Sequence, residues 1–191
     1  MRRPLPPSRL RRFGAAGSLA VAIFASSATL ASQAVTQPAL KAAFLFNFAK
    51  FVEWPAEATA PSGLTLCVLD DTAVEDALGQ LVNGGPVNGR AVTLVKGARN
   101  RPLRGCHLLY VGDSDPGRIA ATLDELKGAP VLTVGDGDAF PRGGGVIGLF
   151  VEDGRMRFAI NPDAAQRAGL RLSSQLLNLA RIVKEGRHGH L

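Results

Sequence analysis

The sequence predicts an α/β domain in which a mixed β-sheet is sandwiched by helices. Apolar, β-prone segments alternate with amphipathic segments along most of the chain, which is typical of parallel strands joined by helices. Near the carboxyl end, two β-prone segments flank an Asp153-Gly154 turn, which predicts an antiparallel hairpin. Together these two observations favour a sheet that contains both strand directions.

The first 34 residues have the layout of a cleavable secretory signal. Several arginines precede an apolar run over residues 15–30, and small residues follow, so we expect cleavage after Ala34. The apolar run is shorter than the ~20 residues that span a bilayer, which argues against the alternative of a membrane anchor. Residues 35–191 are therefore expected to form one exported domain, with a disordered tail from about residue 186.

Most of the positive charge of the chain belongs to this signal. The whole chain has 22 basic and 16 acidic side chains, a net charge of +6. The signal contains five of the basic residues and none of the acidic ones, which leaves +1 on the mature domain. No basic stripe suited to nucleic acid remains, and residues 99–104 are interpreted as a solvated surface loop.

The individual elements follow from apolar periodicity and from capping residues. Asp71 or Thr72 can cap one helix, and Asp115, followed by proline, can cap the next. A last amphipathic helix over residues 172–184 has Leu179 on its apolar face. The expected order is helix 38–52, strand 64–69, helix 72–82, strand 91–95, strand 106–111, helix 116–127, strand 131–134, hairpin strands 146–151 and 156–160, and helix 172–184.

Acidic side chains follow three of the predicted strands, at Asp70, Asp113 and Asp136. The carboxyl ends of parallel strands commonly bind ligands, so these carboxylates could hold Mg²⁺ or Ca²⁺ or line a small-ligand crevice. The alternative is structural, because aspartates at strand ends also cap helices and form turns.

The sequence offers little for catalysis. Nucleophilic catalysis needs a nucleophile beside a base, and the three histidines are His107 in an apolar strand and His188 and His190 in the tail. The glycines at 143–145 lack the Lys-Ser/Thr of a phosphate-binding loop and precede a strand. We therefore expect no enzyme activity and no cofactor.

Two cysteines, Cys67 and Cys106, lie in the mature domain. An even number of cysteines in an exported protein favours a disulfide. The alternative is that both are small buried strand residues that do not meet.

The first helix has a broad apolar face, but Phe46 and Trp54 project onto its polar side near Lys50 and Glu53. Exposed aromatic side chains among polar groups are typical of protein interfaces. We expect these four residues to contact a partner, the alternative being that the two aromatic side chains cover neighbouring loops.

Several of these segments together closely resemble the YfiR family of periplasmic proteins. The most distinctive are the opening helix with its Phe-Val-Glu-Trp-Pro end and the later Ser-Ser-Gln-Leu-Leu. The resemblance extends over nearly all of the mature chain, through residues 41–55, 66–69, 89–90, 106–107, 131–134, 157–161 and 168–177.

The resemblance implies a non-catalytic α/β regulator that holds an inner-membrane diguanylate cyclase inactive. It also implies release by an outer-membrane, peptidoglycan-associated lipoprotein, frequent homodimers, and a match of Cys67 and Cys106 to a family cysteine pair. A second family pair nearer the carboxyl end has no counterpart between Asp138 and Glu152, so the same redox control is not expected. The alternative function is a periplasmic small-ligand sensor that uses the crevice near Asp70, Asp113 and Asp136.

Overall fold

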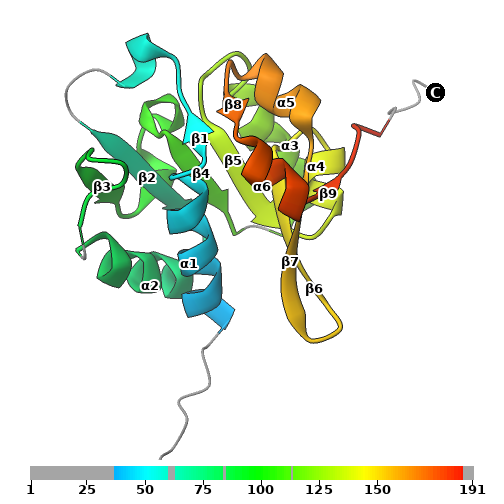
Figure 1. Cartoon of the computed structure of the whole chain (residues 1–191), viewed down its shortest axis with the longest axis horizontal. Helices are drawn as coiled ribbons and strands as arrows, with labels where there is room; N and C mark the ends of the chain where they lie inside the picture. The colour runs from blue at the N-terminus through cyan, green and yellow to red at the C-terminus, as the bar shows by residue number, and fades with distance from the viewer. Residues whose placement is uncertain (1–36, 60–62, 84, 113, 187–191) are drawn as a thin grey trace, which may run out of the picture. The chain divides into compact units, whose positions relative to one another are not determined.

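The structure is a computed structural model that describes residues 37–59, 63–83, 85–112 and 114–186. These residues form an α/β domain with one seven-stranded sheet and a separate two-stranded ribbon (Figure 1). The predicted signal and the tail from residue 187 lie outside the described residues. In chain order the elements are α1 (Gln37–Phe48), β1 (Val52–Glu53), the 3-10 turn η1 (Ala56–Thr59), β2 (Leu64–Leu69), α2 (Thr72–Val82), β3 (Val92–Val95), η2 (Ala98–Asn100), η3 (Leu103–Gly105), β4 (Leu108–Val111), α3 (Pro116–Glu125), β5 (Leu132–Asp136), α4 (Ala139–Arg142), β6 (Ile147–Glu152), β7 (Arg155–Ile160), α5 (Pro162–Arg167), β8 (Arg171–Leu172), α6 (Ser174–Leu179) and β9 (Arg181–Ile182).

The large sheet has the strand order β3-β2-β4-β5-β6-β7-β9. Strands β2 to β6 are parallel, β7 is antiparallel to β6, and β9 is parallel to β7. The predicted mixed sheet and its antiparallel hairpin are thus confirmed. From β2 the chain first adds β3 on one side and then returns to add β4 on the other. Such a reversal is a topological switch point, which opens a crevice at the carboxyl ends of the two central strands.

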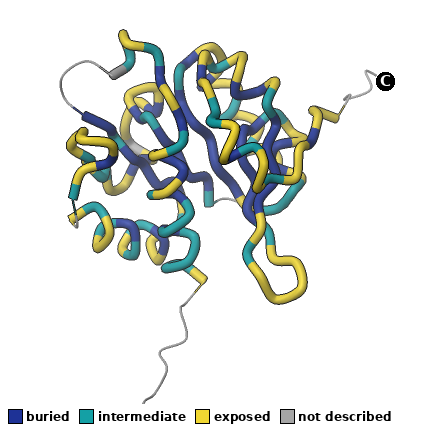
Figure 2. The backbone as a smooth tube through the Cα atoms, in the orientation of Figure 1, coloured by how far each residue is buried: buried dark blue, intermediate teal, exposed yellow. Residues whose placement is uncertain are grey.

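Helices cover both faces of this sheet. In Figure 1, α1, α2 and α6 lie in front of it, and α3 and α4 lie behind it. Because successive strand residues point to opposite faces, Tyr110 belongs to the core under α1, whereas its neighbour Leu109 belongs to the core under α3. Figure 2 shows the buried strands running between the two layers.

Two predicted helix caps are present in the structure. The Asp71 carboxylate accepts a hydrogen bond from the Val74 N–H at 3.0 Å, and the Asp115 carboxylate accepts one from the Arg118 N–H at 2.8 Å. Each carboxylate satisfies an amide that has no partner within the helix. Asp71 and Asp115 therefore act as helix caps. This is the structural alternative that the sequence allowed for acidic residues after strands.

The first and last predicted helices are too long. The helix predicted over 38–52 ends at Phe48, after which Val52 pairs with Leu172 in the β1–β8 ribbon. The helix predicted over 172–184 is confirmed only over α6, and its expected apolar-face residue Leu179 is 70% exposed. After α6 the chain joins the edge of the sheet as β9, and the Val183 N–H just beyond β9 donates to the Ile160 carbonyl at 2.8 Å. Pairing at the sheet edge here outweighs helix periodicity.

Gly145, the last glycine of the run at 143–145, has a packing role. A Cβ atom on Gly145 would lie 2.2 Å from the ring of Phe140, and one on Gly135 would lie 2.3 Å from the same ring. Phe140 is buried in the core under α3. Gly145 is therefore glycine because the aromatic ring occupies the space that its side chain would need.

Candidate functional site

Three of the four predicted contact residues lie along one edge, where α1 ends and β1 begins. The Lys50 ammonium lies 4.8 Å from the centre of the half-buried Phe46 ring and donates a hydrogen bond to the Asn47 side chain at 3.1 Å. The Glu53 side chain is 78% exposed and lies 3.8 Å from the Arg171 guanidinium across the β1–β8 ribbon. We call Phe46, Lys50 and Glu53 the α1 edge.

Trp54 does not belong to this surface. Its side chain is buried, and its indole N–H donates to the His107 carbonyl at 3.0 Å. The two rings meet edge to face with their centres 6.0 Å apart. Extending the helical wheel beyond Phe48 misplaced this residue, and the alternative of packing against neighbouring segments is what the structure shows.

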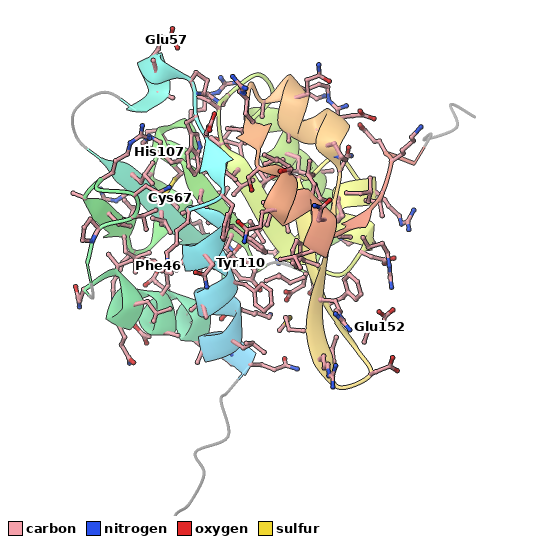
Figure 3. The ribbon with its side chains drawn as sticks, viewed as in Figure 1. Phe46, Glu57, Cys67, His107, Tyr110 and Glu152 are labelled. Carbon is pink, nitrogen blue, oxygen red and sulfur yellow. A yellow bond between two sulfur atoms is a disulfide. The ribbon has the colours of Figure 1, made fainter. Side chains whose placement is uncertain are left out.

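The His107 side chain links two backbone segments through hydrogen bonds. Its Nδ1 accepts a hydrogen bond from the Thr65 N–H at 2.9 Å, and its Nε2 lies 2.6 Å from the Ala58 carbonyl oxygen. Because Nδ1 is an acceptor, the proton lies on Nε2 and donates to Ala58, so the ring is neutral. The ring thereby ties the segment after β1 to strand β2 (His107 is labelled in Figure 3). Because both ring nitrogens bond to backbone groups, His107 has a structural role.

Cys67 and Cys106 form a disulfide, with their Cα atoms 5.9 Å apart. Cys67 lies on β2, and Cys106 lies just before the neighbouring parallel strand β4. Both are buried in the core under α3. Of the two sequence alternatives, the bridge is the one that the structure contains.

The two predicted acidic residues that the structure describes, Asp70 and Asp136, have separate basic partners. Asp70, whose φ is 63°, is paired with Arg99, whereas Asp136 is paired with Lys41. Asp113 lies outside the described residues. Within the described ranges, no group of three or more histidine, cysteine, aspartate or glutamate side chains could hold a metal ion.

Asp136 belongs instead to a network of three side chains under α1. The Lys41 ammonium donates to the Tyr110 hydroxyl at 2.9 Å and to one Asp136 oxygen at 2.6 Å. The Tyr110 hydroxyl donates to the other Asp136 oxygen at 3.0 Å. The Lys41 side chain is only 14% exposed, and Tyr110, labelled in Figure 3, is fully buried. This network fastens the first helix to the carboxyl ends of β4 and β5.

Burial raises the pKa of the Tyr110 hydroxyl far above its ordinary value of 10.0. The negative charge of Asp136 and the hydrogen bond to it raise this pKa further. Since the pKa is higher in the folded protein than in the unfolded chain, the protonated hydroxyl contributes stability that is fully present below about pH 10. That contribution is lost as the pH rises above this value.

Tyr110 is the only tyrosine of the chain, so alkaline titration tests this network directly. We expect no tyrosinate absorbance near pH 10 while the protein stays folded, and its appearance only together with unfolding at higher pH. The same chain in denaturant should titrate near pH 10 and serves as the control. A tyrosinate signal at that pH with unchanged circular dichroism would contradict the burial and bonding described for Tyr110.

Sequence reasoning missed two features of the surface and core. No sequence pattern predicted the contact between Lys41 and Asp136, because the two residues are 95 positions apart. The other feature is the exposure of three large apolar side chains, Val151, Leu179 and Ile182, which are 53%, 70% and 51% exposed. Periodicity assigned Leu179 to a buried helix face, so no sequence signal marked its exposure.

These observations define a class of protein: a disulfide-bonded α/β domain whose histidine, cysteines and strand-end aspartates all have structural partners where they are described. The chain belongs to the YfiR/HmsC-like family, whose profile matches residues 38–181. The match extends from α1 through the first residue of β9 and so covers nearly the whole described fold. Among the described helices, none combines the length and the apolar character needed to cross a membrane.

Proposed function

We propose that this chain is a non-enzymatic periplasmic regulator that binds the periplasmic part of an inner-membrane diguanylate cyclase and lowers cyclic-di-GMP synthesis. The observation that carries this proposal is the YfiR/HmsC-like match over residues 38–181. The signal-like layout of residues 1–34 and the disulfide support an oxidising compartment.

The mechanism that we propose is differential binding. The free regulator binds the inactive state of the cyclase more tightly than the active state, which shifts the cyclase toward inactivity. An outer-membrane, peptidoglycan-associated lipoprotein that sequesters the regulator removes this bias, because the two partners compete for it.

The exposed side chains of the fold support a role in protein contact. The α1 edge combines a half-buried aromatic ring at Phe46 with the exposed charges of Lys50 and Glu53. Val151 of β6, Leu179 of α6 and Ile182 of β9 are further exposed large hydrophobic side chains. Clustered apolar and aromatic groups bordered by charges are typical of interfaces. We propose the α1 edge as the cyclase contact.

Charge reversal on the α1 edge tests this assignment. The variants Lys50→Glu and Glu53→Arg are expected to weaken co-purification with the periplasmic part of the cyclase roughly tenfold or more, since reversing a charge at an interface replaces attraction by repulsion and tenfold corresponds to about 1.4 kcal/mol. Melting temperatures should change little, because both side chains are exposed.

Lys96→Glu is the matched control for these variants. Lys96 is a lysine with a 61% exposed side chain after β3, away from the α1 edge, and its only described ion pair is with the exposed Asp76. Its reversal should leave cyclase binding unchanged. Equal binding by the wild type, the two edge variants and the control would remove the α1 edge from the proposal, and failure of the wild type to bind would overturn the proposed function.

A further inference from the structure

A pocket of about 420 Å³ lies between α3 and the segment that contains η2 and η3. Leu69 at the end of β2 and Leu103 of η3 supply its apolar walls. Three arginines also line it: Arg99 and Arg101 from the η2 segment, and Arg118 from α3. The residues that the sequence suggested were a solvated loop therefore form one wall of a pocket.

The position of the pocket follows from the topology of the sheet. It lies beside the carboxyl end of β2, at the switch point where the chain leaves β2 toward β3 and later returns to β4. The connections after β2 and β4 are packed tightly here, because a Cβ atom on Gly112 would lie 2.6 Å from the Cβ atom of Asp71. In open parallel sheets, ligands bind at this point.

The charges of the lining favour an anion. Three arginines and two acidic residues, Asp70 and Glu125, line the pocket, and the Asp70 carboxylate is paired with Arg99. The arginines come from two separate elements that the fold brings to one cavity. A guanidinium presents a planar fork of donors that matches phosphate and carboxylate groups.

We propose that this pocket binds a small organic anion, with a phosphate or carboxylate group on the arginines and a compact apolar part against Leu69 and Leu103. The pocket volume lies within the ~300–1,000 Å³ range of small-molecule sites. The proposal goes beyond the proposed function and does not depend on it. In a regulator, such a site would supply a small-molecule input separate from the α1 edge.

Binding of simple probes to residues 35–191 tests the proposal. Phenyl phosphate, inorganic phosphate and malonate are added at constant ionic strength, and binding is followed by the melting temperature and by amide chemical shifts in nuclear magnetic resonance spectra. We expect phenyl phosphate to raise the melting temperature more than inorganic phosphate does and to shift the amides of Asp70 and Arg101. A response to malonate alone identifies the carboxylate class and supports the site.

Two variants and one control locate the binding. Arg101→Gln removes a guanidinium for which no ion pair is described and should weaken probe binding roughly tenfold. Ala121→Phe places a ring in the pocket from the exposed side of α3 and should abolish binding. Arg157→Gln, on the exposed part of the β6–β7 hairpin, should have no effect. The proposal is overturned if no probe binds, or if Arg101→Gln and Ala121→Phe bind the probes as the wild type does.

Discussion

Replacing Cys67 and Cys106 together with alanine is expected to lower the free energy of unfolding by about 3 to 4 kcal/mol. The bridge joins residues 39 apart in sequence, so it removes a large amount of conformational freedom from the unfolded chain. For a domain of this size, the melting temperature should fall by roughly 10 °C. Urea denaturation followed by circular dichroism measures the change.

A reducing agent provides the control for this experiment. It should destabilise the wild type to nearly the same extent and leave the double-alanine variant unaffected. Equal unfolding midpoints for the oxidised wild type and the variant would mean that the Cys67–Cys106 bridge contributes nothing to stability.

The second large effect is expected at Trp54. The variant Trp54→Ala should lose about 3 to 5 kcal/mol of stability, because it empties a large buried volume and removes the donor to the His107 carbonyl. Trp54→Phe keeps an aromatic ring and loses the N–H donor, so its cost should be about 1 kcal/mol from the hydrogen bond, in addition to any cavity left by the smaller ring. Urea denaturation followed by circular dichroism compares the two variants.

This comparison separates a structural role of Trp54 from the surface contact that the helical wheel suggested. If Trp54→Ala unfolded at the same urea concentration as the wild type but no longer bound the cyclase, Trp54 would be an exposed contact residue and the described packing would be wrong. Because Trp54 is the only tryptophan, its fluorescence in the wild type gives an independent measure of burial.

The strand pattern of this protein could be predicted from sequence because it is a local signal. Residues 64–69 and 106–111 are mostly apolar, as expected for strands covered on both faces, and β2 and β4 lie within them. The hairpin was marked by Asp153-Gly154, which lies in the turn between β6 and β7. Each of these signals lies within a few residues of the element it predicts.

The residues at which the first and last helices end, in contrast, are set by strand pairing with residues that are distant in the sequence. The chain turns into β1 because Val52 pairs with Leu172, and it turns into β9 because Ile182 pairs with Ile160. Neither partner is within helical reach in the sequence. Helical periodicity therefore extended too far at both places and misassigned Trp54 and Leu179.

The partners of the candidate site residues were beyond sequence reasoning for the same reason. Asp70 and Asp136 occupy similar positions after strands, yet one is held by Arg99 and the other by Lys41 and Tyr110. From the sequence alone, a ligand site and a structural role therefore both stayed open for these aspartates. The disulfide was easier to predict, since a chain with two cysteines allows a single intramolecular pairing.

Cyclic-di-GMP produced by the full-length membrane cyclase, with and without this protein exported to the same periplasm, tests the central claim most directly. The account predicts a lower cyclic-di-GMP level when the wild-type protein is present, and a level restored toward that of the cyclase alone with Lys50→Glu. An unchanged cyclic-di-GMP level in the presence of folded, exported wild-type protein would contradict the proposal that it inhibits a diguanylate cyclase.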